Sequence, residues 1–139
     1  MDYHFVFVSG GSIPDGAQPH GREADGTPLW VARSPGATDP FFLNSIQPGK
    51  VRPGFGAALI PFGGTEVAVG DYEVFMEAGI WVAGSGGQIP DEAIVCGREP
   101  NGDPLFVARA NLNNGVHPGK IRFAFGAAAG CEFIRGIQD

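Results

Sequence analysis

Nearly the same segment occurs twice in this chain, as GGSIPDGAQPHGREADGTPLWVAR at residues 10–33 and as GGQIPDEAIVCGREPNGDPLFVAR at residues 86–109. The two copies align without a gap, and 15 of the 24 positions are identical. After a loop of different length they continue as PGKVRPGFGAA at residues 48–58 and PGKIRFAFGAA at residues 118–128. A short unit that cannot bury its apolar face alone is commonly duplicated. We therefore expect two tandem repeats, at about 7–75 and about 81–134, that share one core.

Length and composition indicate one acidic globular domain. A chain of 139 residues suits a single domain over residues 1–139, and 43% of hydrophobic residues are enough for a core. The formal net charge of -6 argues against nucleic-acid phosphates or an anionic membrane surface as partners. The first eight residues do not fit a signal peptide, and no run reaches 18 apolar residues. We expect no membrane insertion, and either a cytoplasmic location or release by a non-classical route.

Short β-compatible runs separated by turn residues dominate the chain, and no window has sustained helical periodicity. Asp25-Gly26 and Asn101-Gly102 stand just before matching apolar runs, and such pairs are strong hairpin signals. The pattern predicts an all-β fold, a compact pseudo-twofold sandwich or barrel-like domain of short antiparallel strands. The expected strands are 5–8, 29–33, 50–52, 57–61, 66–69, 72–75, 80–83, 105–109, 120–123 and 132–134.

The second copy has no obvious counterpart of the segment Asp71–Phe75 that closes the first copy. The N-terminal segment Asp2–Phe7 is loosely similar to that closing segment. We therefore expect the first strand of the chain to occupy, in the second repeat, the place that residues 72–75 hold in the first.

Few side chains are suited to catalysis, metal binding or redox chemistry. His4, His20 and His117 have no counterparts in the other copy, so we interpret them as surface or loop residues. No pair of nucleophile and base is kept in both copies, and no carboxylate cluster suits calcium. Cys96 and Cys131 also lack counterparts, so we expect no disulfide. The sequence thus predicts a protein that is not an enzyme and needs no metal or cofactor.

Charged residues present in both copies are the candidates for ligand binding. A carboxylate that accepts from vicinal hydroxyls, beside Lys and Arg donors, suits a neutral polyhydroxyl ligand such as a sugar. The structural alternative is cross-strand ion pairs of Glu23 with Arg33 and of Glu99 with Arg109, worth about 0.2 to 1 kcal/mol each. Each Lys lies in a Pro-Gly-Lys turn, which either presents the side chain to a ligand or serves only as a turn. The matching pairs are Arg22/Arg98, Glu23/Glu99, Arg33/Arg109, Lys50/Lys120 and Arg52/Arg122.

Aromatic residues also recur in both copies. Trp30 matches Phe106, and Phe55 matches Phe125. Rings at alternating strand positions usually belong to the core, and the alternative is stacking on a sugar face. The loop 34–47 has 14 residues against 8 in its counterpart 110–117 and contains two adjacent phenylalanines, at positions 41 and 42. These two rings either form a contact patch or dimer interface, or fold back onto the core.

The repeated motifs resemble those of the DM9 repeat family. Gly10–Phe75 contains G-x-I-P-x-x-A, G-x-[DE]-x-[DN]-G, L-[WYF]-V-[AG]-R, P-G-K, [FY]-G-G-x-E and Y-E-V in order, and Gly86–Ala128 matches the first two thirds. The resemblance implies a β-rich protein of two DM9 repeats. Some such proteins are mannose-binding lectins that act in innate immunity, often as homodimers.

The resemblance also implies where a sugar would bind. One site per repeat is expected, around the acidic residue of the G-x-[DE] segment and the Lys of P-G-K. These residues are Glu23 with Lys50 and Glu99 with Lys120, with Asp25 and Asn101 as helpers. We therefore expect a metal-independent lectin for mannose or mannose-containing glycans, with a homodimer to raise avidity. The alternative is a non-catalytic intracellular interaction module without sugar binding.

Overall fold

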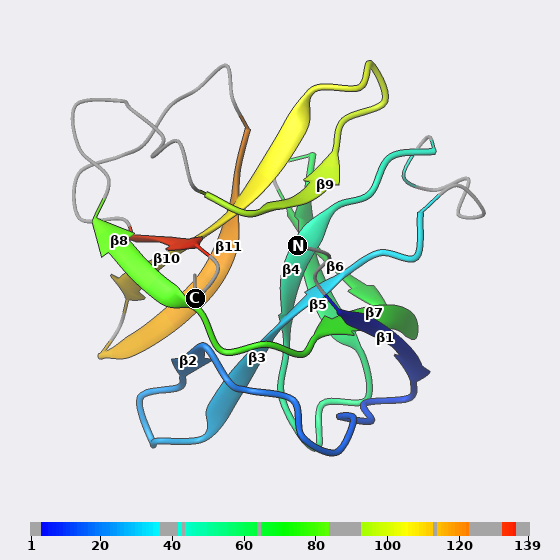
Figure 1. Cartoon of the computed structure of the whole chain (residues 1–139). Coiled ribbons are helices and arrows are strands. Elements are labelled where there is room, and N and C mark those ends of the chain that lie inside the picture. The colour runs from blue at the N-terminus through cyan, green and yellow to red at the C-terminus, as the bar shows by residue number, and fades with distance from the viewer. Residues whose placement is uncertain are drawn as a thin grey trace.

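The fold is built of β-strands, as the sequence predicts (Figure 1). The computed structural model describes residues 4–36, 42, 44–63, 65–83, 93–112, 114–122 and 132–135, and the side chains of 83, 112, 119–122 and 132–135 lie outside the description. In this part of the chain, no helix is long and apolar enough to cross a membrane. Disulfide formation by Cys131 lies outside the described residues, whereas Cys96 is a free, buried thiol.

All ten expected strands are present, and two further short strands accompany them. The two additions, β2 and β9, contain a Gly-Arg pair, and glycine weakens the sequence signal of a strand. The strands of the first half are β1 (Phe5–Ser9), β2 (Gly21–Arg22), β3 (Pro28–Arg33), β4 (Pro48–Val51), β5 (Ala58–Phe62), β6 (Thr65–Val69) and β7 (Asp71–Phe75). Those of the second half are β8 (Ile80–Ala83), β9 (Val95–Arg98), β10 (Pro104–Leu112), β11 (Gly115–Arg122) and β12 (Glu132–Arg135).

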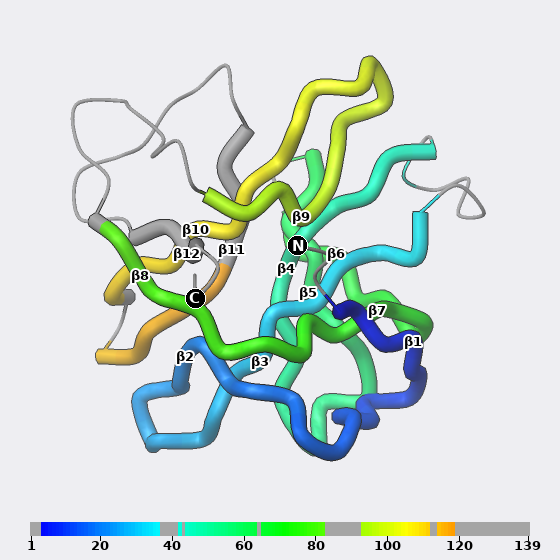
Figure 2. The backbone as a smooth tube through the Cα atoms, in the orientation of Figure 1, coloured from blue at the N-terminus to red at the C-terminus, as the bar shows by residue number. Residues whose placement is uncertain are grey.

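The strands form one open antiparallel sheet. Its order is β6-β5-β4-β3-β2-β11-β10-β12-β8, while β7 pairs with β1 and β3, and β9 pairs with β10. The strands β1 and β3–β7 lie on one side of the molecule, and β8, β10 and β11 lie on the other (Figure 2). The all-β antiparallel class is thus confirmed, whereas a pseudo-twofold axis stays a prediction.

The expected place of the first strand is wrong. β1 pairs with β7 of its own half, with Phe5 opposite Phe75. In the second half it is β12 that pairs with β10, so that Glu132 lies opposite Arg109 as Glu73 lies opposite Arg33. The segment EFIR of β12 differs from DYEVF of β7 in most letters, but a ladder needs backbone pairing and alternation rather than identity. For this reason the counterpart was not evident in the sequence.

The two halves are joined where the backbone of each crosses the other closely. Arg22 of β2 pairs with Val116 of β11, and an isolated bridge joins Ile46 to Arg98 of β9. A glycine lies at each of these two crossings. A Cβ atom added to either glycine would collide with a backbone carbonyl oxygen of the other half. The distance from the added Cβ to the carbonyl oxygen is 2.3 Å for Gly21 and Val116 O, and 2.2 Å for Gly97 and Ile46 O. Glycine is therefore required at this place in both copies because no other residue leaves room for the crossing strand.

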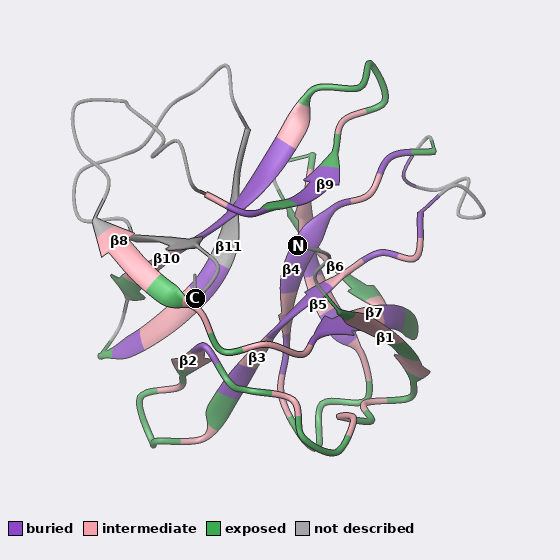
Figure 3. Ribbon diagram, viewed as in Figure 1, coloured by how far each residue is buried: buried purple, intermediate pink, exposed green. Residues whose placement is uncertain are grey.

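Buried side chains form two clusters on opposite faces of β3. Three of the six residues of β3 are buried, and Figure 3 colours the strand by this burial. Ala32 belongs to one cluster and Val31 to the other. Trp30 packs against the first cluster, and Phe106 is buried, so both rings contribute to the core as expected. Phe42 of the long loop is buried against Phe62, with 5.1 Å between ring centroids, while its neighbour at position 41 lies outside the described residues. The loop thus folds back onto the core at Phe42.

The repeated arginines within β3 and β10 take structural positions. Arg33 Nε lies 2.7 Å from Glu73 Oε1, and its guanidinium lies 3.5 Å from the centroid of the Phe5 ring. Arg109 stacks 4.1 Å from the centroid of Trp81 and donates to a backbone carbonyl. A stacked and paired guanidinium fixes the position of neighbouring strands. The expected ion pair of Arg33 with Glu23 is wrong, because Arg33 pairs with Glu73 of β7 and Glu23 lies beside His117.

The crossing glycines generate a stability prediction. Replacement of Gly97 by alanine places a methyl group against a backbone carbonyl, so we expect a loss of about 1 to 3 kcal/mol in the free energy of unfolding. Gly70→Ala is the matched control, because nothing lies within 4 Å of its added Cβ, and we expect a change within about 0.5 kcal/mol. Urea unfolding followed by tryptophan fluorescence measures both. Equal effects of the two substitutions would contradict the close crossing.

His20 generates a prediction about pH. Trp81 Nε1 donates to His20 Nδ1 at 3.1 Å, and His20 Nε2 donates to Glu77 O at 2.8 Å, so the buried ring is neutral. Burial lowers the pKa of His20 below 6.5, and the nearby Arg109 lowers it further, against the raising effect of the Glu77 carbonyl. The unfolded chain then binds the proton more readily, so this stability is present above about pH 6.5 and is lost as pH falls through the lowered pKa.

We therefore expect acidification from pH 7.5 to pH 5.5 to lower the thermal unfolding midpoint less in His20→Gln than in the wild type. Thermal unfolding at the two pH values, followed by circular dichroism, measures the difference. A pH dependence that is unchanged in the variant would show that His20 does not contribute to it.

Candidate functional site

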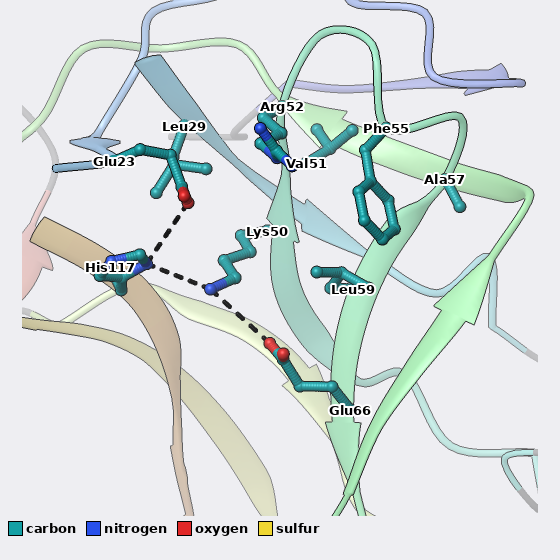
Figure 4. Close-up of a pocket in the computed structure, with 10 residues that line it drawn as sticks. All are labelled: Glu23, Leu29, Lys50, Val51, Arg52, Phe55, Ala57, Leu59, Glu66 and His117. Atoms are coloured by element: carbon teal, nitrogen blue, oxygen red, sulfur yellow. Dashed lines mark hydrogen bonds and ion pairs between the residues drawn. The ribbon is translucent and has the colours of Figure 1, made fainter. Parts of the chain in front are cut away.

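A pocket of about 220 Å³ opens where the two halves meet (Figure 4). The first half supplies nine of its ten lining residues, from strands β3–β6 and from the segments after β2 and β4, and β11 of the second half supplies one. Polar and charged groups lie beside an apolar floor. The lining residues are Glu23, Leu29, Lys50, Val51, Arg52, Phe55, Ala57, Leu59, Glu66 and His117.

The turn between β2 and β3 fixes the position of Glu23. Its backbone N–H donates to Thr27 O at 2.8 Å, and its carbonyl accepts from Gly26 N at 3.0 Å. Gly26 has a φ of 92°, which glycine adopts without strain. Asp25 stabilises the same turn, since its Oδ1 accepts from Thr27 N at 2.9 Å, and these hydrogen bonds lower the pKa of Asp25. Asp25 does not line the pocket, and its role as a helper in binding stays a prediction.

Lys50 lies in the middle of the pocket wall. It belongs to β4, where it is paired with Val31 on one side and Leu59 on the other, so its backbone is held from both directions. Its Nζ donates to His117 Nδ1 at 3.1 Å and lies 3.6 Å from Glu66 Oε2. Only 16% of the Lys50 side chain is exposed, which restricts its ammonium group to the pocket.

The structure brings the predicted pair Glu23 and Lys50 to one pocket, with His117 between them. Glu23 Oε1 lies 3.8 Å from His117 Nδ1, which is too long for a hydrogen bond. Figure 4 shows the resulting row, in which Glu23, His117, Lys50 and Glu66 follow one another along the pocket. Two carboxylates therefore stand at the ends of the row and two nitrogen groups in the middle.

Sequence reasoning missed two residues of this pocket and misplaced another. His117 is not a surface or loop residue, because it lies within β11 and only 18% of its side chain is exposed. Glu66 was noted only as part of a motif. Phe55 is not a core residue, since it is 42% exposed and lines the pocket, whereas its counterpart Phe125 lies outside the described residues. A polar residue before Pro-Gly-Lys in both copies, Gln47 in one and His117 in the other, was the available signal.

The second predicted site is described only in part. The turn around Glu99 repeats that of Glu23, since Glu99 N donates to Asp103 O at 2.8 Å and Asn101 Oδ1 accepts from Asp103 N at 3.0 Å. Gln47, from the other half, donates to Glu99 Oε1 at 3.0 Å. Lys120 pairs with Val107 in the same register as Lys50 with Val31, but its side chain lies outside the described residues. The placement of Glu99 with Lys120 in one site thus stays a prediction.

The groups in the pocket suit hydrogen bonding more than metal binding. Among the described residues, no group of three or more His, Cys, Asp and Glu side chains lies close enough to hold a metal ion. The Glu23 carboxylate offers acceptor sites and the Lys50 ammonium offers donors, at the two positions that flank His117. An exposed ring, Phe55, lies on the same wall. This set of groups matches a ligand that carries hydroxyls on one face and C–H groups on another.

The described residues thus form an antiparallel β-fold with a small pocket of mixed charge. The family model of the DM9 repeat matches residues 40–129, which are 90 of the 139 residues, and the chain therefore belongs to the DM9 repeat family. This is a family of binding modules, and membership is consistent with a carbohydrate-binding module. No curated protein matches the chain. The match does not include the first copy, residues 10–33, so the presence of two DM9 repeats stays a prediction.

Proposed function

We propose that this protein is a non-catalytic lectin whose pocket at Glu23, Lys50 and His117 binds mannose or mannose-containing glycans without a metal ion. The single observation that carries the proposal is the convergence of Glu23 and Lys50, 27 positions apart in sequence, on one pocket of the required chemistry. Mannose is the sugar that the resemblance to lectins of the DM9 repeat family implies.

The charges of the pocket support a neutral hydroxylated ligand. In the described residues, no hydrogen-bond donor engages the Glu23 carboxylate, whose side chain is 30% exposed. Two vicinal hydroxyls can therefore donate to it, while the Lys50 ammonium donates to a ring or hydroxyl oxygen. Hydrogen bonds to charged groups are the stronger kind in a partly desolvated site. Glu66 lies near enough to Lys50 to keep its ammonium oriented.

A second site is proposed at Glu99, Lys120 and Asn101, and a homodimer would double the number of sites. Monosaccharide affinity in so small a pocket is expected to be weak. Several sites on one assembly raise the apparent affinity for a dense glycan surface by effective concentration, with no new contact needed.

Substitution of the two central residues tests the proposal. We expect Glu23→Gln and Lys50→Met each to weaken methyl α-mannoside binding at the first pocket by about tenfold, since each removes one charged hydrogen-bond partner. Isothermal titration at pH 7.5 in the presence of EDTA measures affinity and metal independence together. To observe the first pocket alone, the variants are made in a Glu99→Gln background.

Asp15→Asn is the control for the loss of one negative charge, because Asp15 is exposed and does not line the pocket. Its affinity is expected to equal that of the background protein. If the background protein binds mannose but all three variants match it, the pocket is not the site. If no mannose-bearing glycan is bound on an array, the interaction module without sugar binding is favoured.

The exposed ring gives a second prediction for the same pocket. Phe55→Ala is expected to weaken mannose binding by about fivefold if the ring covers a C–H face of the sugar. Phe55→Tyr keeps the ring and is expected to bind as the background protein does. The Phe7→Ala variant is the control, because Phe7 is 57% exposed on β1 and does not line the pocket. An equal loss in the Phe7 and Phe55 variants would contradict a role of the ring in binding.

A further inference from the structure

His117 stands between the two groups that the proposed ligand would use. Its Nδ1 lies 3.1 Å from Lys50 Nζ and 3.8 Å from Glu23 Oε1. An ammonium group has no lone pair, so Lys50 donates this hydrogen bond and Nδ1 accepts it. The neutral ring therefore carries its proton on Nε2. In that state His117 holds the ammonium group and donates no hydrogen bond to the Glu23 carboxylate.

The matching position in the other copy has a side chain that does not titrate. Gln47 is buried and donates from Nε2 to Glu99 Oε1 at 3.0 Å and to Ser45 Oγ at 2.9 Å. An amide keeps the same protonation across the neutral range, whereas imidazole is the side-chain group that gains a charge between about pH 5 and 8. The two copies thus differ at a position beside the pocket where a single proton changes the hydrogen bonding.

We propose that His117 is a positioning residue that makes ligand binding at the first pocket depend on pH, while Gln47 leaves the Glu99 site insensitive. This inference rests on the proposed sugar binding. When His117 is protonated, Nδ1 no longer accepts from Lys50 and becomes a donor that faces Glu23. The new imidazolium attracts the carboxylate and repels the ammonium group, so both ligand contacts are weakened. Affinity at the first pocket falls on acidification.

The charged groups around the imidazole come from each element packed against it. Glu23 reaches it from the turn after β2, and Lys50 reaches it from β4. Arg52, which directly follows β4 in the chain, lines the same pocket. Glu66 of β6 contacts Lys50 rather than the imidazole. Arg22 of β2 donates to a backbone carbonyl in the turn before β11. Among the described residues, Glu23 is therefore the carboxylate nearest to Nδ1. Its attraction to the imidazole ring increases most when His117 is protonated.

Mannose titrations of two proteins at pH 7.5 and pH 5.5 test the inference. Both carry Glu99→Gln, so that only the first pocket binds, and one also carries His117→Gln, which copies the residue of the other repeat. We expect the protein with His117 to lose roughly fivefold in affinity at pH 5.5, the effect of about one hydrogen bond. The His117→Gln variant is expected to change by less than about twofold.

The outcomes separate the two proposals. Binding at pH 7.5 with the same pH dependence in both proteins overturns the role of His117 and leaves the sugar site intact. No binding in either protein at pH 7.5 overturns the proposed function, and this inference with it. Unchanged thermal unfolding of the variant at pH 7.5 shows that the fold is preserved.

A measurement on the unsubstituted, sugar-free protein provides an independent test. Long-range nitrogen–proton NMR spectra distinguish a protonated from an unprotonated Nδ1. At pH 7.5 we expect His117 to carry its proton on Nε2, and at low pH we expect the signal to show both nitrogens protonated. A proton on Nδ1 at pH 7.5 would overturn the inference, because Lys50 would then have no acceptor there.

Discussion

The close crossing of the two halves is the constraint on which the rest of the structure depends. The backbone of each half passes close to a glycine of the other. A Cβ added to that glycine would lie only 2.2 Å from Ile46 O at Gly97 and 2.3 Å from Val116 O at Gly21. Each crossing ties the residue before a glutamate-bearing turn, Arg22 or Arg98, to the residue two positions before a Pro-Gly-Lys segment of the opposite half. Any larger side chain at Gly21 or Gly97 would separate these strands and, with them, the groups that line the pocket.

This arrangement makes the candidate site composite. Glu23 and Lys50 come from the first half, but His117, which lies between them, comes from the second half. The chemistry of the pocket is therefore set by both copies of the sequence. The same exchange places Gln47 of the first half against Glu99 of the second. A change of the residue before either Pro-Gly-Lys segment therefore alters the surroundings of a glutamate in the other copy.

The charged residues that occur in both copies divide into two groups. The arginines Arg33 and Arg109 stack on aromatic rings and hold strands together. Glu23 and Lys50 face a pocket instead, and no strand pairing depends on their side chains. Repetition in the sequence does not distinguish a residue that holds strands together from one that faces a pocket. Alternation within a strand separates its two faces but does not show which face packs against other residues. Only burial and contacts separate the residues that hold strands together from those that face the pocket.

The sequence by itself determined the all-β class and the ten main strands, because turn residues and alternation are local signals. The meeting of Glu23 with Lys50 was expected from the resemblance of the motifs to the DM9 repeat family. The tertiary structure decided which strands cross, and hence that β12 rather than β1 completes the second half. It also decided that His117 enters the first pocket. Those outcomes depend on contacts between residues far apart in sequence, whose energies no local pattern contains.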